Sequence, residues 1–247
     1  MNNLHAKIDL TIFFPVYNDE RTIRTVTEKA IRVCEELAQN FEVIIIDDCS
    51  PDQSGKIADQ LAREYSCVRV IHHEKNRGYG AAVKSGFKNS RYEWICFTDG
   101  DDEYDIEDVK KIIKLKDFYD LIITFRYKKL YSEKRIFISN IYNKILRWMF
   151  RTQYRDISTG LRMIRKSLLD EIHITSDSPF IGAEITIKTM LKGYRIGEMG
   201  IQTFPRQFGK GSVTSFKNIM ATISDMRRIY REIFSDDYDL PESRGRK

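Results

Sequence analysis

The sequence is poor in cysteine and lacks long hydrophobic runs. Its 247 residues include four cysteines, namely Cys34, Cys49, Cys67 and Cys96. Their spacing fits neither a paired-cysteine zinc site nor the dense disulfide framework of a small secreted protein. No stretch approaches the ~20 apolar residues needed to cross a bilayer, and residues 1–9 contain no apolar core of signal-peptide length. We therefore expect a protein of the reducing cytosol, soluble or peripheral to a membrane, unless an anchor has been removed from it.

Glycine-rich phosphate loops are also lacking. A dinucleotide-binding fold needs such a loop after its first strand, and a P-loop ends in Gly-Lys-Ser or Gly-Lys-Thr. The first apolar run is instead followed by Pro15-Val16-Tyr17, which contains no glycine. Gly78 and Gly80 form the densest glycine cluster, but they follow the third apolar run and Val83 occupies the place of a third glycine. These two nucleotide-binding folds are thereby excluded.

Charge is nearly balanced overall and concentrated in one segment. The formal net charge is +5, from 41 Lys and Arg against 36 Asp and Glu. Residues 124–166 hold twelve basic and two acidic side chains, so this segment alone carries +10. A basic patch suits an anionic partner, but no helix or aromatic platform typical of nucleic-acid readers accompanies it. We predict that nucleic acid is not a partner.

Apolar β-branched runs alternate with helical patterns. The runs predict strands at Leu10–Phe14, Val43–Ile46, Val68–Ile71, Trp94–Phe97 and Leu121–Ile123. Helices are expected over 23–37 and 57–65, after 76–80, and near 135–150, 183–192 and 216–234. This alternation predicts an α/β fold with a mostly parallel central sheet and helices on both faces. With 42% hydrophobic residues to fill the core, we expect one domain over residues 1–234 and a disordered tail over 235–247.

Three of the predicted strands end in polar, chemically reactive segments, at residues 15–19, 47–52 and 99–103. In parallel sheets, ligands bind beyond the carboxyl ends of the strands. The third segment alternates Asp99, Asp101 and Glu103, whose hard oxygen donors suit Mg²⁺ or Mn²⁺ completed by a diphosphate. The alternative is a solvated acidic loop. The position favours the metal, because carboxylates crowded at a buried strand end repel one another without a cation.

The motifs and their order resemble those of the family-2 glycosyltransferases of GT-A fold. Within that family they resemble the dolichyl-phosphate mannosyltransferase-like branch, whose members are polyprenyl-phosphate glycosyltransferases. Pro15-Val16-Tyr17-Asn18-Asp19 resembles the opening Pro-x-Tyr-Asn-Glu of that family, residues 46–52 its Val-Asp-Asp-Gly-Ser-Pro-Asp, and Asp99-Gly100-Asp101 its D-x-D. Residues 125–127, 156–162 and 206–210 are similar to its later motifs. The resemblance covers about residues 10–212. It implies the Rossmann-like GT-A fold and an amphipathic interface helix.

The resemblance also implies site residues. Those for the nucleotide sugar are Pro15, Tyr17, Asp19, Asp47, Asp48, Asp99, Arg206 and Lys210. Those for the metal are Asp99, Asp101 and Glu103. Asp99 would also face the ribose and diphosphate, and Asp101 would also act in catalysis. The chain departs from the family pattern at Asp19 for Glu, Cys49 for Gly and Glu103 for Gln. Gly211-Ser212 stands where Ser-Lys is expected, so Lys210 is taken as the substitute cation.

Basic and acidic residues of the second half are candidates for the acceptor side. Arg126, Arg162 and Arg206 are expected around an acceptor phosphate, because the planar guanidinium matches phosphate oxygens in pairs. An ionised phosphate needs no general base. A rival enzyme of the same fold would act on a sugar hydroxyl and would need one, and Glu184 is then the candidate. Otherwise Glu184 simply favours the start of its helix.

Residues 135–150 predict an amphipathic helix. Its apolar stripe consists of Phe137, Ile138, Ile141, Tyr142, Ile145, Trp148 and Met149, and the opposite side carries Asn140, Asn143, Lys144, Arg147 and Arg151. Such a helix either packs against the core or lies in a membrane interface. The basic segment around it, together with the use of the equivalent helix at the membrane by the resembling family, points to an anionic membrane surface.

These features predict a metal-dependent inverting glycosyltransferase at the cytosolic membrane face. The donor would be a nucleotide-diphosphate sugar of the GDP-mannose or UDP-hexose type, and the acceptor a polyprenyl or dolichyl phosphate. A separate membrane-anchoring subunit is a further candidate partner. The alternatives are the hydroxyl-acceptor enzyme and a catalytically dead nucleotide- or membrane-binding protein, against which the intact segment 99–103 argues. A nucleotidyltransferase is disfavoured by the lack of a glycine-rich phosphate loop.

Overall fold

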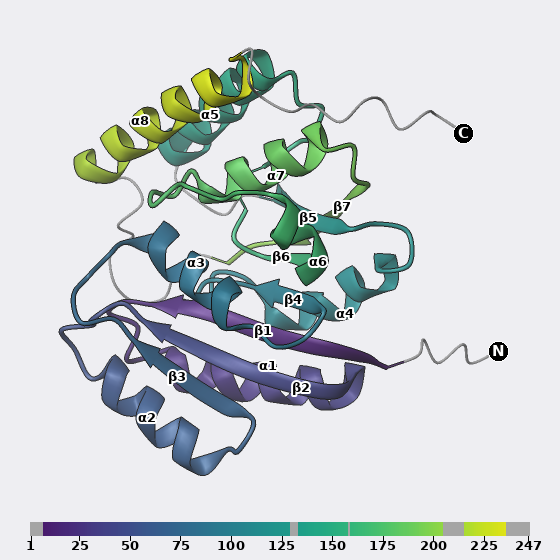
Figure 1. Ribbon diagram of the computed structural model, residues 1–247. Coiled ribbons are helices and arrows are strands. Elements are labelled where there is room, and N and C mark those ends of the chain that lie inside the picture. Colours follow the sequence, from purple (N-terminus) through teal and green to yellow (C-terminus); the bar gives the residue numbers. More distant parts are fainter. Residues whose placement is uncertain (1–6, 129–132, 158, 205–214, 236–247) are drawn as a thin grey trace.

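One sheet of seven strands runs through the middle of the molecule (Figure 1). The computed structural model describes residues 7–128, 133–157, 159–204 and 215–235. The strands lie in the order β3-β2-β1-β4-β6-β5-β7. Their bounds are β1 Ile8–Val16, β2 Ala38–Asp47, β3 Val68–His72, β4 Trp94–Phe97, β5 Leu121–Lys128, β6 Arg162–Arg165 and β7 Ile196–Gln202. β6 is antiparallel to its neighbours β4 and β5, and the other pairs are parallel.

Helices cover both faces of this sheet (Figure 1). Their bounds are α1 Ile23–Leu37, α2 Ser54–Glu64, α3 Tyr79–Asn89, α4 Val109–Ile112, α5 Glu133–Phe150, α6 Lys166–Glu171, α7 Ile181–Leu191 and α8 Phe216–Ile233, with short 3-10 turns η1 Ile106–Asp108 and η2 Ile113–Leu115. Buried residues of α1, α2 and α4 share one apolar cluster, and those of α3, α5, α6, α7 and α8 share the other. The sheet therefore separates two cores.

The alternation of side chains along β1 explains the two cores. Ile12 and Phe14 belong to the cluster under α1, whereas Phe13 between them belongs to the cluster under α3. The Phe13 ring lies 5.2 Å from the ring of Phe87 and 5.5 Å from that of Phe97, centroid to centroid. Because both faces are buried, the strand reads as a continuous apolar run. This is why β1 could be predicted from its residues alone.

The five predicted strands are confirmed, as is the mostly parallel sheet with helices on both faces. β6 and β7 were not predicted. β6 begins and ends with arginine, and β7 contains Gly197 and Gly200. Neither strand offers the run of β-branched apolar residues that marks the others. The predicted tail over 235–247 lies outside the described residues except for Ser235.

The outward side of α5 carries five of the seven residues of the predicted apolar stripe, while Tyr142 and Met149 are partly buried against the core. Phe137, Ile138, Ile141, Ile145 and Trp148 are exposed, with Trp148 at 83%. The core side of the helix is instead formed by Asn143, Leu146 and Phe150, all buried. The predicted polar side therefore divides, because Asn143 turns inward while Lys144 and Arg147 remain exposed.

A second helix, α8, lies along α5 (Figure 1), and the rings of Phe150 and Tyr230 meet at 5.9 Å. It buries Ile229 and Ile233. Its exposed large apolar residues are Phe216, Ile219, Met220 and Tyr230. In the part of the chain that the structure describes, every exposed charged side chain on α5 and α8 is basic, namely Lys144, Arg147, Lys217, Arg227, Arg228 and Arg231. We call these exposed apolar and basic residues of α5 and α8 the outer helix face.

None of the helices in the described ranges is both long and apolar enough to cross a membrane.

Candidate active site

The three polar strand ends predicted from the sequence meet at one edge of the sheet. β2, β1 and β4 are parallel neighbours, so their carboxyl ends lie side by side. The Asp48 amide donates to the Val16 carbonyl at 3.0 Å, and the Thr22 hydroxyl donates to the Gly100 carbonyl at 2.8 Å. These two hydrogen bonds thus link the segments that follow the three strands. We call the acidic side chains at this edge, Asp47, Asp48, Asp99, Asp101 and Glu103, the strand-end cluster.

The first of these segments leaves one aromatic ring at the surface. Pro15 is buried within β1, whereas Tyr17 is 42% exposed. Asp19 turns back on the loop, because its Oδ2 accepts from the Tyr17 amide at 3.0 Å. The Asp19 amide donates to the Ser54 hydroxyl at 2.9 Å. Asp19 therefore shapes the loop that presents the Tyr17 ring.

Asp47, at the end of β2, is held by the neighbouring strand. It is buried, accepts from the Ser50 amide at 3.0 Å, and its Oδ2 lies 2.8 Å from Nδ1 of His72. The other ring nitrogen of His72 lies 3.0 Å from Asp59. Burial alone would lower the pKa of His72, but the hydrogen bonds to Asp47 and Asp59 outweigh it and raise that pKa. A carboxylate on each side thus favours the imidazolium.

Asp48 organises the start of α3. One of its oxygens accepts from the Arg77 amide and the other from the Gly78 amide, both at 2.8 Å. Nδ1 of His73 lies 2.6 Å from the same carboxylate, and Nε2 of His73 lies 2.8 Å from the Ser85 hydroxyl. Neither histidine lies in one of the motifs recognised in the sequence. Their position at the carboxyl end of β3, with His72 as its last residue and His73 directly after it, was the signal that could have found them.

The acidic segment after β4 is more buried than its composition suggests. Asp101 and Glu103 are 4% and 5% exposed, and the Glu103 amide donates to Asp101 at 3.0 Å. Asp99 Oδ1 accepts from the Tyr79 hydroxyl at 2.8 Å. Asp102, which lies between Asp101 and Glu103 in the sequence, instead pairs with Lys29 at 3.0 Å. The cluster is therefore not a solvated acidic loop.

The three predicted metal ligands are not gathered into one ready-made site. Among the described residues, no group of three or more His, Cys, Asp and Glu side chains is arranged to hold a metal ion. In this arrangement Asp99 accepts a hydrogen bond from the Tyr79 hydroxyl, and Asp101 accepts one from the Glu103 amide. The oxygen atoms themselves are of the kind that Mg²⁺ and Mn²⁺ prefer.

Arg126 reaches the acceptor side of the same edge from β5. Its Nε lies 2.8 Å and its Nη2 2.7 Å from Oδ2 of Asp156. The Asn143 amide of α5 donates to the other oxygen of Asp156 at 3.3 Å. Asp156 therefore links Arg126 to Asn143 on the core side of α5. The opposite side of α5 belongs to the outer helix face.

Arg162 does not lie where a ligand can touch it, which corrects the prediction that it contacts an acceptor phosphate. Its side chain is 0% exposed. The guanidinium donates to the Thr159 carbonyl at 2.6 Å, to the Gly182 carbonyl at 2.5 Å and to the Ile157 carbonyl at 3.2 Å. Burial lowers the pKa of Arg162, and the negative charges of Asp156 and Asp99 act against that shift. Arg162 is a buried cation that holds backbone carbonyls beneath the strand-end cluster.

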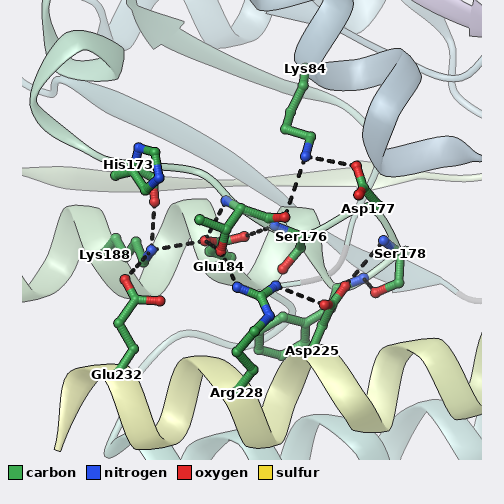
Figure 2. A network of polar contacts seen from close by, with 12 residues as sticks. Lys84, His173, Ser176, Asp177, Ser178, Glu184, Lys188, Asp225, Arg228 and Glu232 are labelled. Atoms are coloured by element: carbon green, nitrogen blue, oxygen red, sulfur yellow. Dashed lines mark hydrogen bonds and ion pairs between the residues drawn. The ribbon is translucent and has the colours of Figure 1, made fainter. Parts of the chain in front are cut away.

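Glu184 is likewise buried, at 0% exposed, in a network between α7 and α8 (Figure 2). It accepts from the Thr175 and Ser176 amides at 2.9 and 2.8 Å and pairs with Lys188 at 2.9 Å. Burial would raise the pKa of Glu184, but the Ser176 hydrogen bond and the Lys188 charge outweigh it and lower that pKa. Lys188 also pairs with Glu232 of α8 at 2.7 Å. This position does not support the catalytic base considered for Glu184, because no acceptor hydroxyl can reach the carboxylate.

Arg206 and Lys210, the two predicted cations of the later loop, lie outside the described residues.

Comparison with known proteins agrees with this arrangement. The family model described as glycosyl transferase family 2 matches residues 11–173. The chain is 29% identical over 172 residues to the undecaprenyl-phosphate 4-deoxy-4-formamido-L-arabinose transferase of Aeromonas hydrophila subsp. hydrophila, covering 69% of this chain and 52% of that protein. It is 23% identical over 238 residues to the glycosyltransferase AglD of Haloferax volcanii, and the match covers 92% of this chain and 38% of that protein. The chain thus spans about half the length, or less, of these curated relatives.

Solved structures share the fold. Glucosyl-3-phosphoglycerate synthase from Mycobacterium tuberculosis, in complex with Mn²⁺, uridine diphosphate and phosphoglyceric acid, matches with a TM-score of 0.65 and 14% identity, over 92% of this chain and 76% of that one. S. aureus TarS, residues 1–349 in complex with UDP-GlcNAc, matches with a TM-score of 0.66 and 18% identity, over 94% and 68%. At these identities the likeness concerns the fold alone.

Proposed function

Because the chain belongs to glycosyltransferase family 2, we propose that it transfers a sugar from a nucleotide-diphosphate sugar to a polyprenyl phosphate. The donor is of the GDP-mannose or UDP-hexose type. The strand-end cluster and the loop of Tyr17 support the donor site. The similarity to an undecaprenyl-phosphate 4-deoxy-4-formamido-L-arabinose transferase supports a polyprenyl phosphate as the acceptor. The transfer inverts the configuration at the sugar.

On the donor side, the exposed Tyr17 ring and the buried Pro15 line the nucleoside position, shaped by Asp19. Asp47 and Asp48 set the walls of that position through their bonds to the histidines after β3. Asp99 faces the ribose and diphosphate. The cations Arg206 and Lys210 of the later loop complete the donor site in this proposal.

Asp101 and Glu103, with Asp99 beside them, would hold Mg²⁺ or Mn²⁺ together with the donor diphosphate. The fit rests on hard carboxylate oxygens buried at the end of β4. When bound, the ion neutralises the charge that develops on the leaving diphosphate. Asp101 is placed for this by its bond to the Glu103 amide.

The reaction is a single displacement. An oxygen of the acceptor phosphate forms a bond to the anomeric carbon while the bond from that carbon to the donor diphosphate breaks, and the nucleoside diphosphate leaves. The phosphate is already ionised near neutral pH, so no base is needed. Arg126, at the end of β5, is the residue we place against the acceptor phosphate, and Arg162 supports the site from beneath through its charge.

One observation carries the choice of a lipid-linked acceptor, namely the outer helix face. Phe137, Trp148 and Phe216 are large and exposed, and the exposed charged side chains described on α5 and α8 are basic. A surface of this composition binds the interface of an anionic bilayer, where a polyprenyl phosphate presents its head group. We therefore place the protein at the cytosolic membrane face, where a separate membrane-anchoring subunit could also bind it.

The alternative considered from the sequence is transfer to a sugar hydroxyl with Glu184 as the base, and the burial of Glu184 argues against it. We expect Arg126→Lys to lower transfer to polyprenyl phosphate while leaving donor binding unchanged, since lysine keeps the charge but loses the paired geometry. Glu184→Gln should lower stability rather than turnover. The measurement is radiolabelled transfer from GDP-mannose and several UDP-hexoses to polyprenyl phosphate or to soluble sugars. Transfer to soluble sugars alone, abolished by Glu184→Gln in a stably folded variant at a typical cost of ~10²- to 10⁴-fold, would replace the lipid-phosphate proposal.

A further inference from the structure

The geometry points to Tyr79 as a positioning residue, which orients the Asp99 carboxylate for the metal–diphosphate end of the donor. This inference rests on the proposed function. Tyr79 is the first residue of α3, and its hydroxyl donates to Oδ1 of Asp99 at 2.8 Å. No motif in the sequence singles it out, because it lies between two glycines in a segment that matches no phosphate loop.

Asp99 is held from a second side. A Cβ atom on Gly160 would lie 2.5 Å from the other oxygen, Oδ2, so only glycine leaves that carboxylate its place. The Tyr79 hydroxyl and the backbone at Gly160 therefore confine Asp99 between them. The Tyr79 hydroxyl is the donor of this hydrogen bond, because an ionised carboxylate can only accept.

The first turn of α3 is fixed in turn by residues 175–178. The Gly80 amide donates to the Asp177 carbonyl at 3.0 Å, and a Cβ on Gly80 would lie 2.5 Å from the Asp177 carbonyl carbon. Lys84, one turn further along α3, pairs with the Asp177 carboxylate at 2.7 Å (Figure 2). Together with the hydrogen bond that the Gly78 amide donates to Asp48, these contacts hold the backbone on both sides of Tyr79.

Residues 175–178 are themselves anchored on the helices of the acceptor side (Figure 2). Glu184 of α7 accepts from the Thr175 and Ser176 amides. Asp225 of α8 accepts from the Ser178 amide at 3.2 Å and pairs with Arg228 at 2.7 Å. The buried network around Glu184, which does not support a role as base, therefore also connects α7 and α8 to the first turn of α3, where Tyr79 lies.

The test measures nucleotide binding, not only turnover. Affinities of UDP and GDP, each with and without Mn²⁺, are determined by calorimetry for the full chain, Tyr79→Phe, Asp99→Asn and the double variant. A hydrogen bond to a charged group is typically strong enough that its loss weakens binding by about 10- to 100-fold. We expect that loss in Tyr79→Phe only in the presence of Mn²⁺, and no further loss when Tyr79→Phe is added to Asp99→Asn, because both changes remove the same interaction.

Two further variants distinguish the positioning role of Tyr79 from a merely structural effect of its substitution. Tyr154→Phe makes the same change at a buried tyrosine outside the strand-end cluster and should bind as the unmodified chain does. Gly160→Ala displaces Asp99 from its other side and should reproduce the Mn²⁺-dependent loss. Unchanged binding in Tyr79→Phe, or a loss that adds to that of Asp99→Asn, would overturn the positioning role while leaving the donor site intact. Unchanged binding in Asp99→Asn would overturn both the positioning role and the donor-site proposal.

Discussion

The strand-end cluster and the outer helix face are built in opposite ways. At the strand ends, acidic side chains are buried and tied by hydrogen bonds, as Asp48 is to the Arg77 and Gly78 amides. On α5 and α8, large apolar side chains such as Trp148 remain exposed among basic residues. Binding of a diphosphate and a metal depends on fixed directions and distances. Binding to a bilayer scales with area and charge and has no comparable directional requirement.

This difference makes a general expectation about substitutions. A change of a few atoms in or beneath the strand-end cluster should have a large effect, because each polar group there has partners that would be left unsatisfied. A single substitution on the outer helix face should have a small effect, because several neighbouring residues contribute to the proposed membrane contact. Substitutions in the two regions test this contrast.

Arg162→Met should lower the free energy of unfolding by about 3–5 kcal/mol, because it leaves buried carbonyls such as Thr159 and Gly182 without their donor. Urea unfolding measures the change. Arg165→Met is the matched control on the same strand, since that arginine is partly exposed and its guanidinium lies over the Trp94 ring. Equal stability of the two variants would show that the buried framework beneath the cluster is dispensable.

Asp101→Asn should reduce sugar transfer by at least ~10²-fold, equivalent to about 2.7 kcal/mol of transition-state stabilisation, with little change in unfolding temperature. The substitution removes a charge from the proposed metal site and no core volume. Unmodified protein in EDTA should be equally inactive. The control is Asp102→Asn, because the neighbouring carboxylate pairs with Lys29 instead. Full activity of Asp101→Asn without metal would remove the metal assignment.

Charge reversal at Lys144, Arg147 and Arg151 to Glu should release the protein from anionic liposomes. Each basic residue near such a surface contributes about 1 kcal/mol. Nucleotide affinity should stay unchanged, because the strand-end cluster is not touched. Sedimentation with liposomes is the measurement. The matched control reverses three exposed basic residues of α1 and α2 on the other side of the sheet, Arg32, Lys56 and Arg63. Equal release by both triple variants would show that α5 has no special part in binding.

The smallest effect is expected at His72. Asp47 and Asp59 raise the pKa of His72 in the folded protein, so the stabilisation is fully present below the unfolded value of about 6.5. It is lost as the pH rises through the folded pKa. The effect is small because the ring is partly exposed. Unfolding free energies of the unmodified chain and His72→Gln should therefore converge between pH 6 and pH 8.5. A constant difference over that range would mean that His72 acts by packing alone.

Much of the fold and part of the site could be predicted from local pattern. Apolar runs such as 43–46 marked strands buried on both faces, and parallel connection then brought their polar ends together. The same pattern could not find β6, where Met163 and Ile164 stand between two arginines. It also could not assign His72 and His73, whose partners lie 25 residues away in sequence.

The α/β architecture, the family and the polar segments at the strand ends could be inferred from the sequence, because hydrophobic period and motif order are properties of neighbouring residues. The tertiary structure alone decided which charges are accessible. Arg162 and Glu184 are buried by contacts with carbonyls and amides of other segments, and α5 turns its apolar stripe outward because Asn143 is bound by Asp156 and Leu146 fills the core. Burial and the direction of a side chain depend on residues distant in the chain, and no local pattern records them.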